Sequence, residues 1–286
     1  HEWKLDAATG RKLLTAFLEA GDQPSIDGFN TYCVARFAHE RGLKVVLSGL
    51  GGDELFGGYG SFRLVPKLVR AGRWASLIPL VPALAGRMLE TFAPSPRLSR
   101  LGHFLADQPS EASAYWCMRG IFTPAEGAQL VHYFSGDAAD SAPGESHHFE
   151  VPRQPTLADT VSYLELTRYM RNQLLRDSDV MSMASGLELR LPFVDRKLFE
   201  VLRLIPASLR LASGKRLLLD AVPEIPEWVA SAPKRGFAFP FEQWIGAEWG
   251  EVFQQLKKNC PVPLRTWYQC WCVHALEQCF TRLGLR

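Results

Sequence analysis

The sequence predicts an α/β fold that is predominantly helical and contains part of a parallel sheet. Apolar side chains recur at helical spacing along most of the 286 residues. One short β-branched run, residues 44–47, has the composition of a strand, and a glycine-rich loop follows it directly. A helix, a strand and a glycine-rich loop in succession are typical of one unit of a parallel sheet. Because a lone parallel strand needs neighbours, either further strands are hidden in the sequence or the rest of the sheet precedes His1.

Two helices are expected before this strand. Apolar residues at helical spacing around Leu13 and Phe17 predict the first helix, which the segment 21–25, containing Gly and Pro, interrupts. A second helix is expected over about 29–41, and the glycine that follows ends it. The strand itself is apolar and β-branched, so we expect it to be buried.

Beyond Tyr59 the chain is expected to be almost wholly helical, with joints rich in proline and glycine near 79–96 and 136–155. The second joint has little apolar periodicity and is the best candidate for an exposed, mobile loop. A long helix is expected over about 156–176, and its apolar residues on two faces predict a helix buried in the middle of the domain. A shorter helix is expected over about 196–204.

The loop after the strand is the segment with the clearest chemistry. Residues 48–59 read SGLGGDELFGGY, with five glycines in ten residues. Glycines at the carboxyl end of a strand let backbone N–H groups approach phosphate oxygens, and Asp53 and Glu54 add oxygen ligands that suit Mg²⁺. These features predict a nucleotide–magnesium loop. The alternative is a tight strand-to-helix turn in which Glu54 only starts a helix, and the loop by itself leaves both open.

Two further segments carry charged residues in defined settings. Residues 179–195 place Glu188 and Arg190 among apolar residues, which predicts buried, paired charges that organise the structure. Residues 234–240 form a loop bounded by glycine and proline, in which Lys234 could neutralise charge on a leaving pyrophosphate. A solvated basic turn is the alternative for this second segment.

Together, and in this order, these three segments resemble the synthetase domain of the glutamine-dependent asparagine synthetase family. The family pattern is a strand and S-G-x-G-G/S-D-E-L-F-G-G-Y, then D-x-x-S-M-A-x-x-L-E-x-R-x-P-F-x-D, then K-x-G-F-x-x-P-x-x-x-W. Residues 48–59, 179–195 and 234–244 match these blocks, and 214–219 resemble the family's K-x-x-L-R segment less closely. The resemblance covers about residues 22–244.

The resemblance implies an ATP pyrophosphatase fold, of the adenine nucleotide alpha hydrolase type, over residues 1–244. Residues 245–286 would then be a C-terminal helical extension. It also implies ATP and Mg²⁺ as cofactors and a two-step reaction. A carboxylate attacks the α-phosphate of ATP and releases pyrophosphate, and ammonia derived from glutamine then displaces AMP to form an amide.

Functional roles follow from the resemblance only at matched positions. It implies that Asp53 holds Mg²⁺ together with pyrophosphate and that Lys234 stabilises the adenylation transition state, so both are candidate catalytic residues. The candidates for binding the nucleotide or its phosphates are Ser48, Gly49, Gly51 and, with the weakest match, Lys215.

The sequence also departs from the family pattern. The family's pyrophosphate loop, S-G-G-x-D-S, and its N-terminal glutaminase domain, the source of ammonia, are not found in these residues. With His1 rather than Met at the start, we expect a truncation inside the synthetase domain that removes its first strand. We therefore expect these residues alone to bind ATP weakly and to be inactive. Leu50 stands where family members often carry Glu, and Val180 stands where they tend to have a basic residue.

These departures leave the acceptor carboxylate open. Asparagine synthesis from aspartate is the favoured function. Because leucine cannot titrate or accept a proton, Leu50 supports an alternative, in which a family member acts on another carboxylate such as a sugar acid or a small metabolite. A non-catalytic family member is the third hypothesis, and the retained Asp53 and Lys234 argue against it.

Composition adds expectations about partners and location. With 32 basic and 30 acidic residues, the near-neutral charge predicts neither a nucleic-acid nor a membrane partner. The most apolar run, 77–85, is short and interrupted by prolines. Six cysteines without metal-site spacing predict a reducing, cytoplasmic location. A homodimer is compatible with this interpretation.

Near the C-terminus, Trp267 and Trp271 are spaced as on one face of a helix. This spacing predicts that they lie in the hydrophobic core or at a partner contact.

Overall fold

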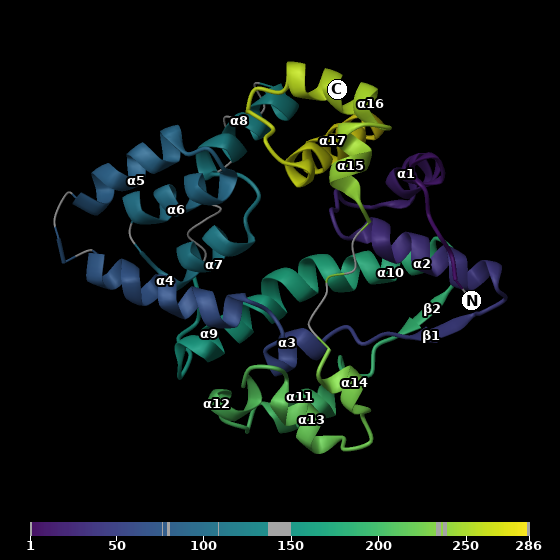
Figure 1. Ribbon diagram of the computed structural model, residues 1–286, viewed down its shortest axis with the longest axis horizontal. Coiled ribbons are helices and arrows are strands. Elements are labelled where there is room, and N and C mark those ends of the chain that lie inside the picture. Colours follow the sequence, from purple (N-terminus) through teal and green to yellow (C-terminus); the bar gives the residue numbers. More distant parts are fainter. Residues whose placement is uncertain are drawn as a thin grey trace.

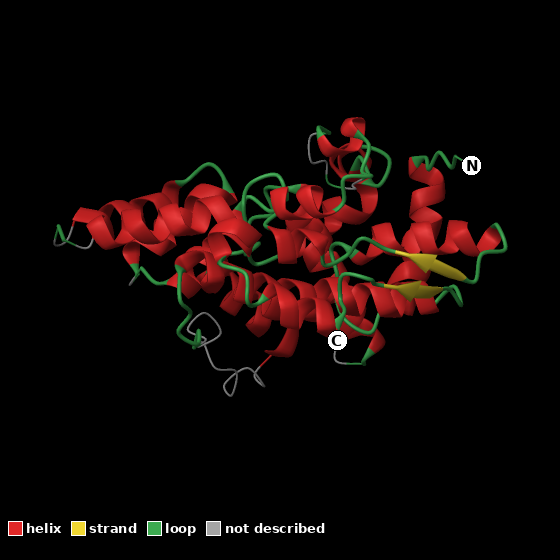
Figure 2. Ribbon diagram, turned by 90° about the horizontal axis from the view of Figure 1, so that it is seen from below, coloured by secondary structure: helices red, strands yellow, loops and turns green. Residues whose placement is uncertain are grey.

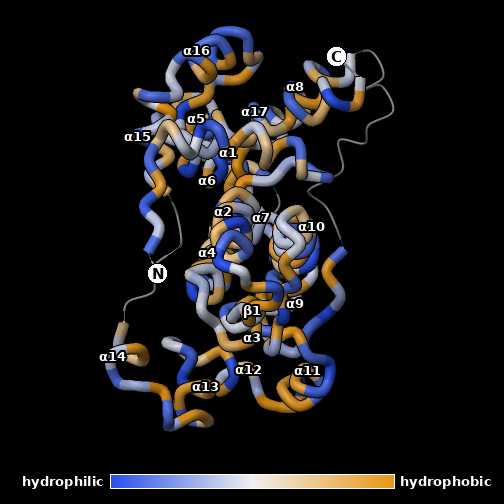
Figure 3. Tube along the Cα trace, turned by 90° about the vertical axis from the view of Figure 1, so that its right-hand side faces the viewer, coloured by the Kyte–Doolittle hydropathy of each residue, from blue (hydrophilic) through white to orange (hydrophobic). Residues whose placement is uncertain are grey.

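The computed structural model describes residues 2–75, 77–78, 81–107, 109–136, 150–232, 236 and 239–284. Figures 1 and 2 show a largely helical molecule in which two short strands lie side by side. Figure 3 shows α15, α16 and α17 at one end of the molecule and α11 to α14 at the other, with α9 and α10 between them. A predominantly helical chain with a small parallel sheet is therefore confirmed.

The elements follow the chain in three groups. The first group contains α1 (Ala7–Ala20), α2 (Gly28–Glu40), β1 (Val45–Leu47), α3 (Gly52–Phe56), α4 (Ser61–Ala75), α5 (Val81–Phe92) and α6 (Pro96–Ala106). The second contains α7 (Glu111–Arg119), α8 (Pro124–Ser135), α9 (Leu157–Leu164), the π-helix η2 (Glu165–Leu174), α10 (Leu175–Met183) and β2 (Glu188–Arg190). The third contains α11 (Arg196–Leu202), α12 (Ala207–Arg210), α13 (Arg216–Ala221), α14 (Glu227–Ala230), α15 (Phe241–Gly246), α16 (Gly250–Asn259) and α17 (Trp267–Arg282).

The sheet contains a second strand that the sequence conceals. β2 pairs with β1 in parallel, with Val45 opposite Glu188 and Leu47 opposite Arg190. The prediction that Glu188 and Arg190 are buried is wrong. Their side chains are more than half exposed, and they pair with each other, with Arg190 Nε 2.9 Å from Glu188 Oε1. In a two-stranded sheet, alternate side chains remain open to solvent unless another element covers that face.

The prediction that β1 is buried is also wrong. Val45 and Leu47 are 43% and 74% exposed, although the strand lies where the sequence predicts it. Within the part of the chain that the structure describes, β1 has β2 as its partner in the sheet. The apolar, β-branched composition therefore identified the strand correctly, but it wrongly predicted that other elements cover both faces of the strand.

The helices largely match their predictions. α1 and α2 lie where apolar spacing places them, and α2 is followed by Gly42 in the left-handed region, at φ +79°. The expected joint near 79–96 is wrong over most of its length. It contains α5, because Pro82 stands in the first turn of a helix, where its missing N–H costs nothing. The expected loop at 136–155 falls mostly outside the described residues.

One nearly continuous helical rod crosses the middle of the molecule. It consists of α9, η2 and α10, and Figure 1 shows it running between the α4–α7 helices and the two strands. It confirms the predicted helix over 156–176 and extends it to Met183. The expected burial holds in α9, where Val161 and Leu164 are buried, but not for the apolar residues of η2, which are partly exposed. Glu165, at the start of the π-helical turns, is fully buried. No helix among the described ranges is both long and apolar enough to cross a bilayer.

The largest core joins the first helices to the last ones. Phe17 and Phe29 from α1 and α2 pack against Trp271 of α17, with ring centroids 6.1 and 5.5 Å away. The indole N–H groups of Trp249 and Trp271 donate to backbone carbonyls of Ala7 and Ser25. The predicted apolar face of the last helix is thus part of this core. The expected division of the chain at residue 244 stays a prediction.

A buried carboxyl links the rod to α2. Ser25 Oγ donates to Asp177 Oδ2 over 2.6 Å and accepts the backbone N–H of Gly28 over 2.9 Å. Burial raises the pKa of Asp177 to about 6, an effect that the hydrogen bond from Ser25 opposes and the nearby Asp27 and Asp22 reinforce. The folded protein therefore holds the Asp177 proton more tightly than the unfolded chain does.

This raised pKa predicts a pH-dependent stability difference. Stability from the protonated Asp177 is present at about pH 4 and is lost as pH rises through about 6. We expect Asp177→Asn to gain on the order of 2–3 kcal/mol relative to the parent chain across that window, measured by urea unfolding at a series of pH values. Asp179→Asn, at an exposed position of the same helix, should show no such trend. A difference between Asp177→Asn and the parent that is flat with pH would contradict the assignment.

Candidate functional site

The glycine-rich loop connects β1 to α3 at the carboxyl end of the strand. Ser48 extends the sheet by donating its N–H to Arg190 O over 2.9 Å, and its Oγ accepts the N–H of Leu50 over 3.3 Å. Gly51 then takes φ +96° and Gly57 takes φ +72°, so α3 begins and ends at left-handed residues. Residues with a side chain rarely adopt these backbone angles, which explains glycine at both positions.

Asp53 and Lys215 meet beside this loop. Asp53 lies in the first turn of α3, and its Oδ1 is 2.7 Å from the Nζ of Lys215. Lys215 precedes α13 and has φ +57°, the one positive φ of a non-glycine residue among the described positions. A left-handed lysine is strained, and such strain is concentrated at functional sites. A Cβ on Gly58 would lie 1.9 Å from Asp53 Oδ1 and 2.9 Å from Lys215 Cε, so glycine is required beside the pair.

The pair opens onto a cavity of about 880 Å³. The loop supplies one wall through Asp53 and Gly58, and Arg63 from α4 adds a second cation to the lining, besides that of Lys215. The rest of the lining is mostly apolar and comes from α13, α14 and the residues next to them; it includes Leu218, Leu219, Ile225, Val229 and Ala232. Cavities of this volume, with apolar walls and a few charged groups, are typical of sites for small molecules.

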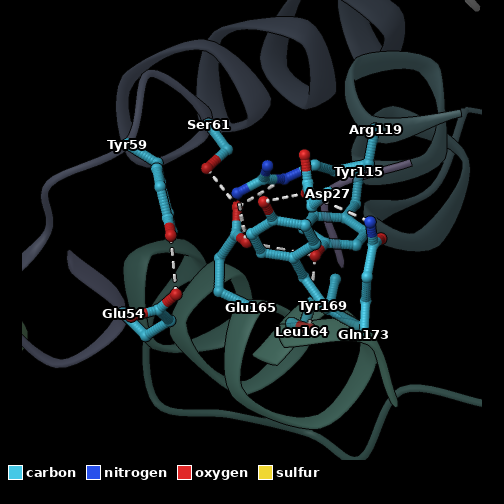
Figure 4. Close-up of polar contacts among 10 residues, drawn as sticks. All are labelled: Asp27, Glu54, Tyr59, Ser61, Tyr115, Arg119, Leu164, Glu165, Tyr169 and Gln173. Atoms are coloured by element: carbon cyan, nitrogen blue, oxygen red, sulfur yellow. Dashed lines mark hydrogen bonds and ion pairs between the residues drawn. The ribbon is translucent and has the colours of Figure 1, made fainter. Parts of the chain in front are cut away.

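A buried ion pair lies next to the loop, where Figure 4 shows side chains from several helices converging on one carboxylate. Arg119 donates two hydrogen bonds to Glu165, with Nη2 to Oε2 at 2.6 Å and Nε to Oε1 at 3.2 Å. Ser61 Oγ also donates to Oε1, and the Tyr115 hydroxyl donates to Oε2 over 3.2 Å. The Glu165 side chain is fully buried, so these four bonds replace its lost hydration.

Two tyrosines sandwich the Arg119 guanidinium. Its carbon lies 4.5 Å from the ring centre of Tyr59 and 3.9 Å from that of Tyr169. Burial alone would lower the pKa of Arg119, but the charge and hydrogen bonds of Glu165 outweigh it and raise the pKa. Arg119 is therefore a permanent cation inside the fold.

The hydroxyl groups of the two tyrosines extend the hydrogen-bond network beyond Arg119 and Glu165. The Tyr59 hydroxyl donates to Glu54 Oε1 over 2.6 Å, and burial followed by this bond raises the pKa of Tyr59. The Tyr169 hydroxyl donates to Asp27 Oδ2 over 2.9 Å, and Gln173 Nε2 donates to the same oxygen over 3.0 Å. Burial raises the pKa of Asp27. The network thus connects the loop with α2, α4, α7 and η2.

The structure brings some of the predicted site residues together. Asp53 and Lys215 form an ion pair at the cavity. Ser48, Gly49 and Gly51 lie in the loop that leads from β1 to Asp53, and they are not among the residues that line this cavity. Lys234 lies outside the described residues. Arg63, Arg119 and Glu165 were not predicted. Arg63 follows the loop by only four residues, so its position was a usable signal, whereas Arg119 and Glu165 belong to no local motif.

The donor set also bears on metal binding. Among the described positions, no three His, Cys, Asp or Glu side chains are placed to hold a metal ion together. Mg²⁺ is usually held by one or two carboxylates together with the phosphates of a substrate. The single carboxylate of Asp53, facing a cavity with Lys215 and Arg63, fits a metal that arrives with a phosphate ligand.

Comparison with known proteins gives one consistent family. A family model described as asparagine synthase matches residues 1–281. The asparagine synthetase (glutamine-hydrolyzing) 1 of Bacillus subtilis is 31% identical over 224 residues, covering 77% of this chain and 34% of that protein. A putative asparagine synthetase (glutamine-hydrolyzing) of Mycobacterium bovis is 30% identical over 243 residues, covering 78% and 33%.

A more distant relative is the protein named amidase chyE of Penicillium rubens. It is 24% identical over 269 residues, covering 82% of this chain and 38% of that protein. The chain spans about a third of the length of the first two relatives. No solved structure matches it with statistical significance.

The buried pair predicts a large and specific stability effect. Arg119→Met leaves the fully buried Glu165 without a counter-charge, so we expect a loss of about 3–5 kcal/mol in the free energy of unfolding, measured by urea denaturation. Arg119→Met combined with Glu165→Gln should recover much of that loss, because the remaining groups are neutral.

The matched control is Arg36→Met. It breaks an exposed pair with Glu40 on α2 and should cost about 0.5 kcal/mol or less. If Arg119→Met costs no more than this control, the buried pair does not hold the region together.

Proposed function

Because the chain belongs to the asparagine synthase family, we propose that it carries out the ATP-dependent, AMP-forming step of an amide synthesis. In this reaction a carboxylate is adenylated and ammonia then displaces AMP. The observation that carries the proposal is the Asp53–Lys215 ion pair, which opens onto a cavity beside the loop and short helix that follow the carboxyl end of a parallel strand. Ligands of open α/β sheets bind at this end of the strands.

The proposed roles follow the charges around the cavity. Asp53 is the oxygen ligand for Mg²⁺ bound with pyrophosphate. Lys215 contacts phosphate oxygens, which compete with Asp53 for its ammonium group. When bound, the metal would neutralise phosphate charge. Ser48, Gly49 and Gly51 would contact the nucleotide through the loop backbone.

Lys234 is proposed to stabilise the transition state of adenylation. Its support is the sequence match. A lysine in this role would meet the negative charge that develops as pyrophosphate leaves. Apolar residues of α13 and α14 would limit water at the reacting carbon and so protect an acyl-adenylate from hydrolysis.

The acceptor proposed first is aspartate, so that the product is asparagine. Two observations support a second candidate, another carboxylate such as a sugar acid or a small metabolite. Leu50 replaces a carboxylate that family members often carry, and one relative is named an amidase rather than an asparagine synthetase. We further propose that residues 1–244 belong to an ATP pyrophosphatase fold with 245–286 as a helical extension, and that ammonia comes from a glutaminase domain.

The proposal is tested by ATP–pyrophosphate exchange in the complete protein with a panel of carboxylic acids. We expect exchange that depends on a carboxylate and on Mg²⁺, because adenylation is reversible until ammonia arrives. Exchange with aspartate alone would exclude the second candidate. No exchange with any acid, from a protein that binds ATP, would contradict an adenylating function.

A glycine substitution separates site geometry from folding. Gly58→Ala must displace the Asp53 carboxylate from Lys215, so we expect exchange to fall by roughly a hundredfold or more. The free energy of unfolding should change by about 1 kcal/mol or less, because the ion pair is partly exposed. Gly60→Ala is the control, since its Cβ would have its nearest neighbour at 4.0 Å. Equal exchange by both variants would disprove a role for the Asp53–Lys215 pair.

A further inference from the structure

The cavity beside Asp53 contains a cation without a counter-charge. Among the described residues that line it, the charged side chains are those of Asp53, Lys215 and Arg63. Two cations and one carboxylate leave this lining with a net charge of +1. Because Asp53 and Lys215 neutralise each other across 2.7 Å, the excess charge belongs to Arg63. A cavity with this charge attracts anionic ligands.

Arg63 is unpaired because of the helix that carries it. Residues 61–75, which form α4, contain four Lys or Arg residues and no acidic residue, so the helix offers Arg63 no partner one turn away. Within the part of the chain that the structure describes, its exposed guanidinium group has no ion pair or hydrogen bond. Such a group presents a planar set of donors that binds a carboxylate through two parallel hydrogen bonds.

The same lining has no acidic group available for a ligand's ammonium group. Its one carboxylate among the described positions is that of Asp53, which is bonded to Lys215 and is the proposed ligand of Mg²⁺. In the loop before Asp53, Leu50 stands where family members often carry Glu, so the loop adds no carboxylate at that position. Placing an ammonium group in a cavity with mostly apolar walls is costly when no acid receives it.

We propose that the site recognises its acceptor by a second anionic group, which Arg63 binds, and not by an amino group. The acceptor class is then a carboxylic acid that carries a second carboxylate or another anionic group. This inference rests on the proposed function, because it concerns the acid that is adenylated. Aspartate belongs to this class through its second carboxylate, but its amino group is not required.

The phosphates of ATP are the other anions in the proposed reaction. Their charge already has three proposed counter-charges, namely Mg²⁺ held by Asp53, the ammonium group of Lys215 and that of Lys234. Arg63 is additional to these and comes from α4 rather than from the loop or from the segment before α13. The acceptor is therefore the ligand that Arg63 is left to bind.

The test is ATP–pyrophosphate exchange by the complete protein with four matched acids. Succinate is aspartate without the amino group, β-alanine is aspartate without the second carboxylate, and propionate lacks both groups. We expect the KM of succinate to lie within about threefold of that of aspartate. The KM values of β-alanine and propionate should be roughly tenfold higher or more, because they lack the hydrogen bonds between Arg63 and a charged partner.

Substitution of Arg63 should remove this preference. Arg63→Gln should raise the KM of succinate roughly tenfold to a hundredfold, and leave the maximal rate and the KM values of propionate and ATP unchanged. Arg63→Lys should recover part of the loss, because it keeps the charge without the planar set of donors. Arg70→Gln is the control, since it removes an exposed arginine of α4 that does not line the cavity. A purely structural role for Arg63 would not change the ratio of the two KM values.

A binding measurement decides the inference independently of the reaction. Succinate should raise the melting temperature of the complete protein, with or without ATP, more than propionate does at the same ionic strength. Arg63→Gln should abolish this difference, whereas Arg70→Gln should keep it. Both positions are exposed, so the variants should melt like the parent when no acid is present.

Three results in the exchange assay would overturn the inference. The first is exchange with aspartate but not with succinate, which would show that the amino group is recognised. The second is an equal KM for succinate and propionate. The third is a higher KM of ATP rather than of succinate in Arg63→Gln, which would assign Arg63 to the phosphates. No exchange with any acid would instead contradict the proposed function, and equal melting with succinate and propionate would then overturn this inference as well.

Discussion

The arrangement of this chain depends on one buried carboxylate. Glu165 lies in the central rod without contact to solvent, and Arg119 neutralises it through two hydrogen bonds. Because an unpaired buried charge costs several kcal/mol, the groups that complete this site are held in place with it. Ser61 starts α4 and Arg119 ends α7, and both bond to the same carboxylate. Both ends of the helical segment from α4 to α7 are therefore bonded to the rod at the same residue, Glu165.

The same pair fixes the loop that carries the candidate chemistry. Arg119 lies against the ring of Tyr59, and the Tyr59 hydroxyl holds Glu54 on α3. Asp53 precedes Glu54 on that short helix. The bond from Tyr59 to Glu54 therefore holds the helix backbone from which the Asp53 carboxylate reaches Lys215. A site positioned by buried side chains keeps its geometry better than one that depends on an exposed loop alone.

The range of each interaction explains what the sequence could predict. The loop, α2 and the central rod depend on residues a few positions apart, so spacing and glycines identified them. β2 was missed because Glu188 and Arg190 give it a polar sequence, and only its pairing with the distant β1 makes it a strand. Arg119 was missed for the same reason, since its partners Tyr59 and Glu165 are remote in sequence and the fold alone brings them together.

The α4–α6 segment is anchored to the rod at its start, whereas the large apolar side chains on the outer face of α5, those of Leu84, Met88 and Phe92, are exposed. At its base, Ser61 is bonded to Glu165; farther out, α5 meets α6 through the backbones at Gly86 and Gly102. Neither contact uses the large side chains on the outer face of α5. Their identity can therefore change without altering the pair on which the loop depends. A surface of this kind can be specialised for a partner while the cavity beside Asp53 keeps its geometry, because the two are set by different residues.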